Sequence, residues 1–554
     1  MSFIHPVLPP FDPDAWKQLP FPERARAVCL SWAEDGYGTP VAIFGVYALK
    51  IAAFVGVWAW ACADAPGLGP LSELGRWVLE PLALYKAVVW AMLFEVLGFG
   101  CGSGPLTARY MPPVGGFLYF LRPGTTRLPP APSLPGCGGH QRTAVDVVLY
   151  AGIVVALGAE LLYAGVGGPG AFATLLLLPL AGLRDRTVFL AARGEHYWVA
   201  LVIALLSLVA GAGAMVAGWM GLWGALWFFA GVSKLNRHFE TVVCVMMSNS
   251  PVMRSKPLRR AMYRDFPRDL RPSRLAQLLG HFGTLLEFSV PVVLLTAGGA
   301  MPQLVAGLAL MWMLHTYITS NVPMGVPLEW NVMMVYGGMA LFWGHPDISV
   351  LDATPQVIAL LLVVSVGVPV LGNLFPERVS FLPAMRYYAG NWAMSVWLFK
   401  DGTHDKLAAL PKSAPWVEDQ LGVLYDKRTI AGLLSKVMAF RLMHLHGRAL
   451  GMLLPQAIDD DLSSRTWMDG EVVAGLLLGW NFGDGHLHGD ALLDVVRARC
   501  GYAPGELRVI TVESQPIHRG ELSWTIHDAA TGPIDSGIVT VDELRERQPW
   551  DLGR

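Results

Sequence analysis

Four ionisable side chains in the middle of the chain could do chemistry, because they stand in or beside apolar sequence. Lys234 follows the run "GLWGALWFFAGVS", His281 and Glu287 share "HFGTLLEFSVPVVLL", and His315 lies in "LMWMLHTYITSN". Ionisable groups are costly inside a membrane and usually face the interior of a helical bundle with a partner. On a helix, the six-residue spacing of His281 and Glu287 separates them by about 240°. A shared site must therefore be assembled between helices.

Four further polar residues flank the same apolar segments and are candidates for contacts with a bound substrate: Asn236, Asn321, Glu329 and Asn331. A structural interpretation of these residues is also open. Lys234 could end an apolar helix, where the helix dipole and the lipid headgroups favour a cation. The other side chains could be packed polar groups that have ordinary hydrogen-bond partners.

Four more charged residues, Lys50, Lys86, Glu95 and Glu160, fall inside apolar segments. Taken singly, we interpret them as structural ion pairs, or as side chains that reach from a helix end to the membrane surface.

The stretch "GWNFGDGHLHGD" (479–490) is the most chemically suggestive part of the soluble C-terminal sequence. Asp484, His486, His488 and Asp490 alternate, so an extended chain would place them on one face. Imidazole and carboxylate groups suit zinc or iron, which makes Asp484, His486 and His488 metal-ligand candidates. A glycine-rich turn in which Asp490 caps the following helix explains the same pattern, and we favour it over a metal.

The elements that position these residues are membrane helices. Of the 554 residues, 53% are hydrophobic and 15% are charged, and the net charge of −2 excludes recruitment of nucleic acid by a basic field. A transmembrane helix needs about 20 largely apolar residues, and the candidate runs are Val41–Cys62, Pro81–Gly100, Ala144–Ala164, Ala171–Leu183, Trp198–Trp219, Leu222–Val232, Phe282–Ala297, Pro302–Thr319, Asn331–Trp343 and Gln356–Leu374. Because three of these runs are short, about eight to ten transmembrane helices are predicted.

Loop charges predict the orientation. Residues 101–143 carry four arginines and no acid, and residues 233–280 carry ten Lys or Arg against three acids. Basic loops stay on the cytoplasmic side. We therefore expect a multi-pass protein of the inner (plasma) membrane whose N- and C-termini are both cytoplasmic.

Composition divides the chain into four parts. Residues 1–40 form an interfacial segment that we expect to lie on the membrane through its aromatic side chains, and 41–375 form the transmembrane domain. Residues 376–400 are aromatic and poor in charge, which predicts an interfacial helix. From 401 to 554 the sequence reads as a cytoplasmic α+β domain with strands in "GELRVITVES" and "ELSWTIHDAATGPIDSGIVTV". The predicted fold class is an all-α polytopic membrane bundle with a small C-terminal α+β soluble domain.

Three motifs, in order, carry a family resemblance: "AGVSKLN", "HFGTLLEFSVPVVLL" and "LHTYITSNVPMGVPLEWNVMM". They resemble the lysine motif and the two following helices of the vitamin K-dependent γ-glutamyl carboxylases, within the horizontally transferred transmembrane domain superfamily. The resemblance covers roughly residues 220–345. The chain also looks like an uncharacterised bacterial transmembrane family.

The resemblance implies a membrane enzyme that acts on a quinol or another lipid-soluble substrate, in which Lys234 is the catalytic base. Burial favours the neutral amine that such a base requires. In this scheme His281 and His315 line the site and Glu287 orients one of them. The large extramembrane region that grips a protein substrate in the carboxylases has no evident counterpart, so we expect a quinone or lipid substrate, with a quinone-type cofactor as one possibility.

Two other functions stay open at the level of sequence. The protein could be a non-catalytic membrane scaffold whose 401–554 domain recruits a protein partner, or a proton-coupled transporter. We expect membrane lipids and a lipophilic small molecule as partners, and no nucleic acid. The basic segment 253–274 fits anionic lipid, and no nucleic-acid-binding motif accompanies it.

Overall fold

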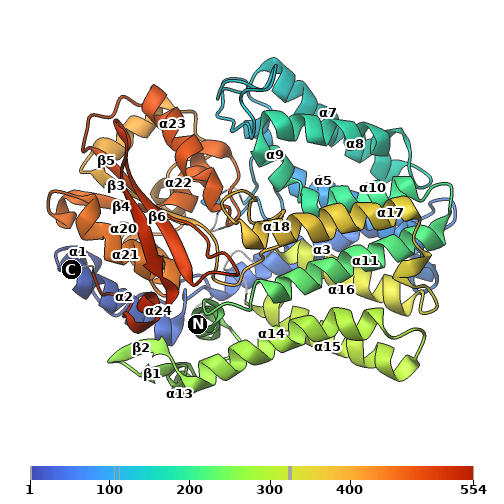
Figure 1. Cartoon of the computed structure of the whole chain (residues 1–554), viewed down its shortest axis with the longest axis horizontal. Coiled ribbons are helices and arrows are strands. Elements are labelled where there is room, and N and C mark those ends of the chain that lie inside the picture. The colour runs from blue at the N-terminus through green and yellow to red at the C-terminus, as the bar shows by residue number, and fades with distance from the viewer. Residues whose placement is uncertain (1–2, 105–106, 112, 322–326, 553–554) are drawn as a thin grey trace.

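The computed structural model describes residues 3–104, 107–111, 113–321 and 327–552, and it places a helical bundle beside a five-stranded sheet (Figure 1). Six helical stretches of the described chain are long and apolar enough to cross a membrane: α3 (Val41–Cys62), α7 (Ala144–Leu162), α11 (Ala212–Val232), α14 (Arg274–Leu295), α15 (Met301–Ser320) and the continuous stretch Pro355–Leu374. A seventh candidate is bent by 108°, where Leu71–Trp77 meets α5 (Pro81–Val96). The prediction of a helical membrane protein is confirmed, with fewer long spans than the ten apolar runs suggested.

The predicted span Trp198–Trp219 is wrong. A π-helical turn (Gly194–Trp198) leads into α10 (Val199–Leu206), and five residues separate the end of α10 from the start of α11. Gly211, the residue before α11, has a φ of 92°, a value that a glycine adopts without steric cost. Hydropathy alone misses this break because the residues around it are apolar. Other short apolar helices are α8 (Pro169–Arg184) and α12 (Phe239–Asn249).

Helices α3 and α11 occupy opposite environments in the bundle. Only 11% of the apolar window in α3 is buried inside the protein, against 78% for α11. An apolar helix that leaves its side chains uncovered by protein is suited to contact lipid. Helix α3 therefore forms an outer wall, whereas α11 is central and packs on α10, α14 and α16 (Leu328–Gly338).

The C-terminal unit is built on an antiparallel sheet in the order β4-β3-β5-β6-β7. The strands are β3 (Met394–Lys400), β4 (Arg465–Asp469), β5 (Leu507–Val512), β6 (Glu521–Asp528) and β7 (Gly532–Thr540). Helices α20 (Lys427–Leu442), α21 (Leu445–Ala457), α22 (Gly470–Leu478), α23 (Asp490–Arg499) and α24 (Val541–Glu546) complete the unit.

Strand β3 corrects the predicted interfacial helix at 376–400. Residues 376–393 form turns without a helix, and 394–400 form a buried strand between β4 and β5. An aromatic run with few charges fits a buried strand as well as a membrane surface, because both environments exclude water. The α+β unit therefore starts at about residue 394 rather than 401.

The N-terminal segment packs on protein rather than on lipid. Helices α1 (Pro13–Lys17) and α2 (Phe21–Asp35) lie against α20, and α2 also contacts α12. Trp16, Phe21 and Trp32 are 7%, 5% and 0% exposed, and the indole N–H of Trp32 donates to the carbonyl of Val245. The prediction that these side chains lie in the membrane surface is wrong, since an amphipathic pattern does not reveal which apolar environment its face meets.

The arginines of the 101–143 loop are also used within the fold. Arg127 and Arg142 are each 2% exposed, and they form ion pairs with Asp146 and Asp185 respectively. Their positive charges are neutralised by protein, so they no longer serve as evidence for a loop that faces anionic lipid. The orientation of the chain in the membrane stays a prediction.

Candidate functional site

Lys234 lies two residues after the C-terminal end of α11 and forms an ion pair with Glu287 of α14. The Nζ–Oε2 distance is 2.7 Å, and the two side chains are 9% and 6% exposed. Lys234 also donates to the carbonyl oxygen of Ala230, in the last turn of α11, at 3.1 Å. The amine is therefore enclosed among helices, as a shared site requires, but it is engaged by a carboxylate.

His315 joins the same region from α15. Its Nδ1 lies 2.8 Å from Oδ1 of Asn331, and its Nε2 accepts a hydrogen bond from the indole of Trp227 at 2.9 Å. Accepting at Nε2 places the ring proton on Nδ1, so neutral His315 donates to Asn331. Both ring nitrogens are satisfied, which fixes the ring between α11, α15 and α16.

The other residues predicted for this site lie elsewhere. His281 is exposed on α14, on a different side of the helix from buried Glu287. Asn236 bonds within its own turn, to Ser233 and His238. Asn321 donates to the carbonyl of Tyr317 at the end of α15. Residues 322–326, within the third motif of the family resemblance, lie outside the described residues.

Glu329, in the first turn of α16, belongs to a second cluster, together with Glu95 and Cys101. Ligand atoms of these three buried side chains all lie within 4.8 Å of one another. The backbone N–H of Cys101 donates to both carboxylate oxygens of Glu95, at 3.2 and 2.9 Å. Two carboxylates and a thiol that converge in this way could bind a metal ion or share a proton.

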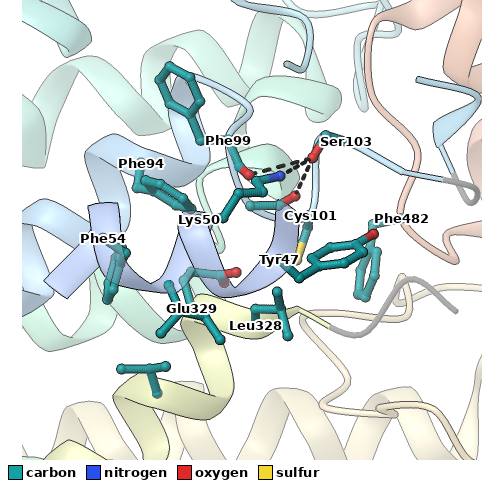
Figure 2. Close-up of a pocket in the computed structure, with 13 residues that line it drawn as sticks. Tyr47, Lys50, Phe54, Phe94, Phe99, Cys101, Ser103, Leu328, Glu329 and Phe482 are labelled. Carbon is teal, nitrogen blue, oxygen red and sulfur yellow. Dashed lines mark hydrogen bonds between the residues drawn. The ribbon is translucent and has the colours of Figure 1, made fainter. Parts of the chain in front are cut away.

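A narrow cavity opens onto this cluster (Figure 2). Lys50 of α3 lies at the cavity and donates a 2.6 Å hydrogen bond to Ser103, in the loop after α5. The remaining lining is mainly apolar or aromatic: Tyr47, Ile51, Phe54, Phe94, Phe99, Leu328, Val332 and Phe482. Beside the polar groups there is room for about one water molecule, so a larger occupant requires side chains of the lining to turn aside.

Trp330 lies between the two clusters. Its ring centroid is 6.1 Å from that of His315 and 4.9 Å from that of Tyr387, and the Arg193 guanidinium lies 5.6 Å from the centroid of Trp330. Arg193 in turn pairs with Glu195 at 2.8 Å, and its Nη1 lies 3.5 Å from Sγ of Cys101. The "EWN" triplet at 329–331 thus connects the Lys234 side of the bundle with the cavity side.

The predicted metal ligands of the C-terminal unit do not converge. The segment forms a short 3-10 turn (Gly485–Leu487) rather than a strand, and Nε2 of His486 lies 2.9 Å from the carboxylate of Glu513. His488 turns instead to Oγ of Ser395, at 2.7 Å, and burial lowers the pKa of His488 to about 3. Asp484 accepts the backbone N–H of His486, which closes the turn.

His486 and Glu513 form a partly protected ion pair. Burial opposes the charged form of each group, but the Glu513 carboxylate raises the pKa of His486. In turn, the His486 charge and hydrogen bond, a backbone N–H and nearby Arg386 lower the pKa of Glu513 to about 2. This electrostatic pairing accounts for His486 without a metal.

The cavity cluster was only partly visible in the sequence. The sequence marks Glu329 as a candidate and favours a structural role for Lys50 and Glu95, but no sequence pattern points to Cys101 or Arg193. One signal was available: Glu95 is followed by the glycine-rich stretch "LGFGCGSG" (97–104), which lets the backbone approach buried groups closely. At Gly100, an added Cβ would lie 2.4 Å from Oε1 of Glu95 and 2.7 Å from Oε2 of Glu329.

By contrast, Lys86 and Glu160 are structural, but through buried hydrogen bonds rather than the expected ion pairs or contacts with the membrane surface. Lys86 donates to the carbonyls of Leu161 and Tyr163, and Glu160 accepts from the hydroxyl of Tyr85. These bonds hold the ends of α5 and α7 together.

Comparison with known proteins identifies one relationship. A family model described as a transmembrane protein of unknown function, DUF3556, matches residues 1–553. No curated protein and no solved structure matches the chain. The comparisons give no support to the carboxylase-like superfamily.

Proposed function

The chain belongs to this family of transmembrane proteins, and on that premise we propose that it is a membrane enzyme acting on a lipid-soluble molecule with one polar end, such as a quinone. The observation that carries the proposal is the cavity beside Glu95, Cys101 and Glu329. It combines an aromatic and aliphatic lining with a cluster of polar groups at one point, which is the usual make-up of a small-molecule site.

The position of α3 supports a route from the lipid. Tyr47, Lys50, Ile51 and Phe54 of this helix line the cavity, and the rest of α3 is little covered by protein. A lipophilic molecule that passes beside α3 would meet the aromatic lining first and the charged groups afterwards. Lys50 can bind an oxygen atom of the polar end, and the buried carboxylates can hold or exchange its proton.

In this proposal the Lys234–Glu287 pair positions helices, and the chemistry takes place at the cavity. An ammonium held 2.7 Å from a carboxylate is already neutralised. To act as a base, Lys234 would first have to transfer its proton and part from Glu287. Its assignment as the catalytic base stays a prediction, which the double variant Lys234→Met/Glu287→Leu separates from the structural role.

The test compares two substitutions on α16. Val332 lines the cavity, whereas Val335, one turn further along, is half-buried outside that lining. Lipid and quinone extracts of cells that express wild type, Val332→Phe or Val335→Phe should be profiled by mass spectrometry. We expect a product that is lost in Val332→Phe and in Lys50→Met and retained in Val335→Phe. Identical profiles at equal protein levels would contradict the proposal that the protein is an enzyme acting at this cavity.

A groove in the C-terminal unit favours a second candidate, recruitment of a protein partner. It runs between the N-terminal segment and α20 and reaches β4, an outer strand of the sheet. Its lining includes both charged and apolar side chains, among them Arg24, Ile430 and Trp467. If extracts are unchanged in all variants while a protein co-purifies through this groove, the partner-binding function is the better account.

We further propose that the protein resides in the plasma membrane with both termini in the cytoplasm. Arg268 is exposed in the turn between β1 (Tyr263–Asp265) and β2 (Asp269–Pro272), and the six native cysteines are buried. Arg268→Cys should therefore react with a membrane-impermeant thiol reagent only after the cells are opened. Labelling of intact cells would reverse the orientation.

A further inference from the structure

We propose that Glu95, Cys101 and Glu329 bind one borderline divalent metal ion, Zn²⁺ or Fe²⁺, at the inner end of the cavity. The proposal deepens the proposed function, because it supplies the reactive centre of the same site. Two carboxylates with one thiolate are a mixed donor set that suits these ions, whereas magnesium and calcium take oxygen ligands alone.

The three side chains need to move only slightly to coordinate one metal ion. Two ligand atoms bound to one zinc ion at about 2.0–2.3 Å can lie no more than about 4.5 Å apart. The three side chains already lie within 4.8 Å of one another, without an ion. Gly100 allows this approach, since any side chain there would occupy the space between the Glu95 and Glu329 carboxylates.

Unpartnered polar atoms supply an independent reason to expect a ligand. Glu329 is 2% exposed, yet neither of its carboxylate oxygens accepts a hydrogen bond from the described residues. Nearby, the hydroxyl of Tyr197 and both ring nitrogens of His196 are also buried and unpartnered within the described chain. Buried polar groups are normally satisfied, and two facing carboxylates are satisfied either by an ion between them or by a shared proton, which the metal analysis below distinguishes.

A divalent cation binds carboxylate and thiolate groups in their ionised forms, so its binding is coupled to the release of protons from these ligands. Two cationic side chains lie beside the cluster: Lys50 lines the cavity, and Arg193 pairs with Glu195 at 2.8 Å.

Neighbouring groups also hold the ligands in position. The N–H of Cys101 orients the Glu95 carboxylate, and Nη1 of Arg193 lies 3.5 Å from Sγ of Cys101, where its charge would favour the thiolate form of a metal-bound Cys101. Such outer contacts accompany most protein metal sites. Three protein ligands leave a coordination position open, as in catalytic zinc sites. Cys101 and Glu329 both line the cavity, so this position faces the proposed substrate.

The experiment measures metal content in the full-length protein in detergent. Wild type is stripped with a chelator, exposed separately to Zn²⁺, Fe²⁺ or Co²⁺, desalted and analysed for metal. We expect about one ion per chain, and at least a tenfold loss of affinity in Cys101→Ser and in Glu329→Gln. The controls Cys62→Ser and Glu160→Gln alter a buried thiol and a buried carboxylate outside the cluster and should bind as wild type does.

A spectroscopic measurement on wild type avoids dependence on variants that fail to fold. The Co²⁺ form should show a thiolate-to-cobalt charge-transfer band, and this band should be absent from Cys101→Ser. Monodisperse wild type that retains less than about a tenth of an ion per chain with every metal would overturn the proposal, as would equal binding by all variants. Because no substrate is added, either result is independent of whether a lipophilic substrate exists.

Discussion

Replacing Lys234 by Met isolates the buried ion pair that joins α11 to α14. At 2.7 Å and an effective dielectric constant of about 20, the attraction within the pair is about 6 kcal/mol. Much of this is offset by desolvation, but removing one partner leaves a buried charge alone and typically costs about 3–5 kcal/mol. We therefore expect Lys234→Met to lower the thermal midpoint of the detergent-solubilised protein by about 3–4 °C.

The double variant Lys234→Met/Glu287→Leu decides between the two roles of the lysine. Replacing both members of a buried pair by apolar residues is often neutral or stabilising, so the double variant should regain most of the lost stability. If the pair is structural, the double variant should also retain the wild-type lipid and quinone profile.

Two outcomes would refute this reasoning. A Lys234→Met variant as stable as wild type would show that the ion pair does not stabilise the packing of α11 on α14. A double variant that is stable but no longer forms the product would support Lys234 as the catalytic base. Midpoints from fluorescence-detected size exclusion, taken beside extract profiles from the same cells, provide both readouts.

Three further predictions concern the cavity and the C-terminal unit. Gly100→Ala should destabilise the protein by about 1–3 kcal/mol and abolish metal binding, because the added Cβ would contact the carboxylates of both Glu95 and Glu329. The control Gly45→Ala should change neither property, because no atom lies within 4 Å of its added Cβ. Thermal midpoints and metal analysis of both variants test this prediction. The lowered pKa of Glu513, about 2, stabilises the fold above about pH 4.5, and this contribution is lost as the pH falls toward 2. The raised pKa of His486 stabilises the fold below about pH 6.5 and is lost as the pH rises through its folded value, so the pair contributes most between these limits. Glu513→Gln should flatten a plot of midpoint against pH, and an unchanged plot would show that the pair does not couple to folding. Burial lowers the pKa of Lys436 to about 8, so its share of stability should increase between about pH 8 and 10.5; Lys436→Met should remove this rise in the same plot.

Hydropathy was sufficient to locate most of the long membrane helices. The apolar run Val41–Cys62 matches α3 at both ends, and the run at 302–319 lies within α15. The break near Gly211 was missed because the residues on either side of it are apolar. Strand β3 was missed because an aromatic, uncharged segment suits any environment without water, and only pairing with β4 and β5 decides between them.

For the candidate site too, the sequence revealed individual polar residues but not their contacts with distant segments of the chain. The "EWN" triplet was visible as polar residues at the start of an apolar helix, and so was the lysine that ends α11. The partnership of Glu329 with Glu95 and Cys101 depends on more than two hundred residues of intervening chain. No single-sequence pattern reports which helices pack together, so the partners of a buried charge have to come from the fold.

The first turn of α16 makes the two halves of the polar interior mechanically dependent. Glu329 and Asn331 are two residues apart on one helix and so point about 200° apart. A ligand that draws Glu329 toward itself by rotating this turn also swings Asn331 against His315. Thermodynamic reciprocity then applies. If binding of the ligand changes the proton affinity of His315, protonation of His315 changes the affinity for the ligand by the same factor. The protonation of His315 on one side of the bundle and the binding of a ligand at Glu329 on the other would then be coupled through the first turn of α16.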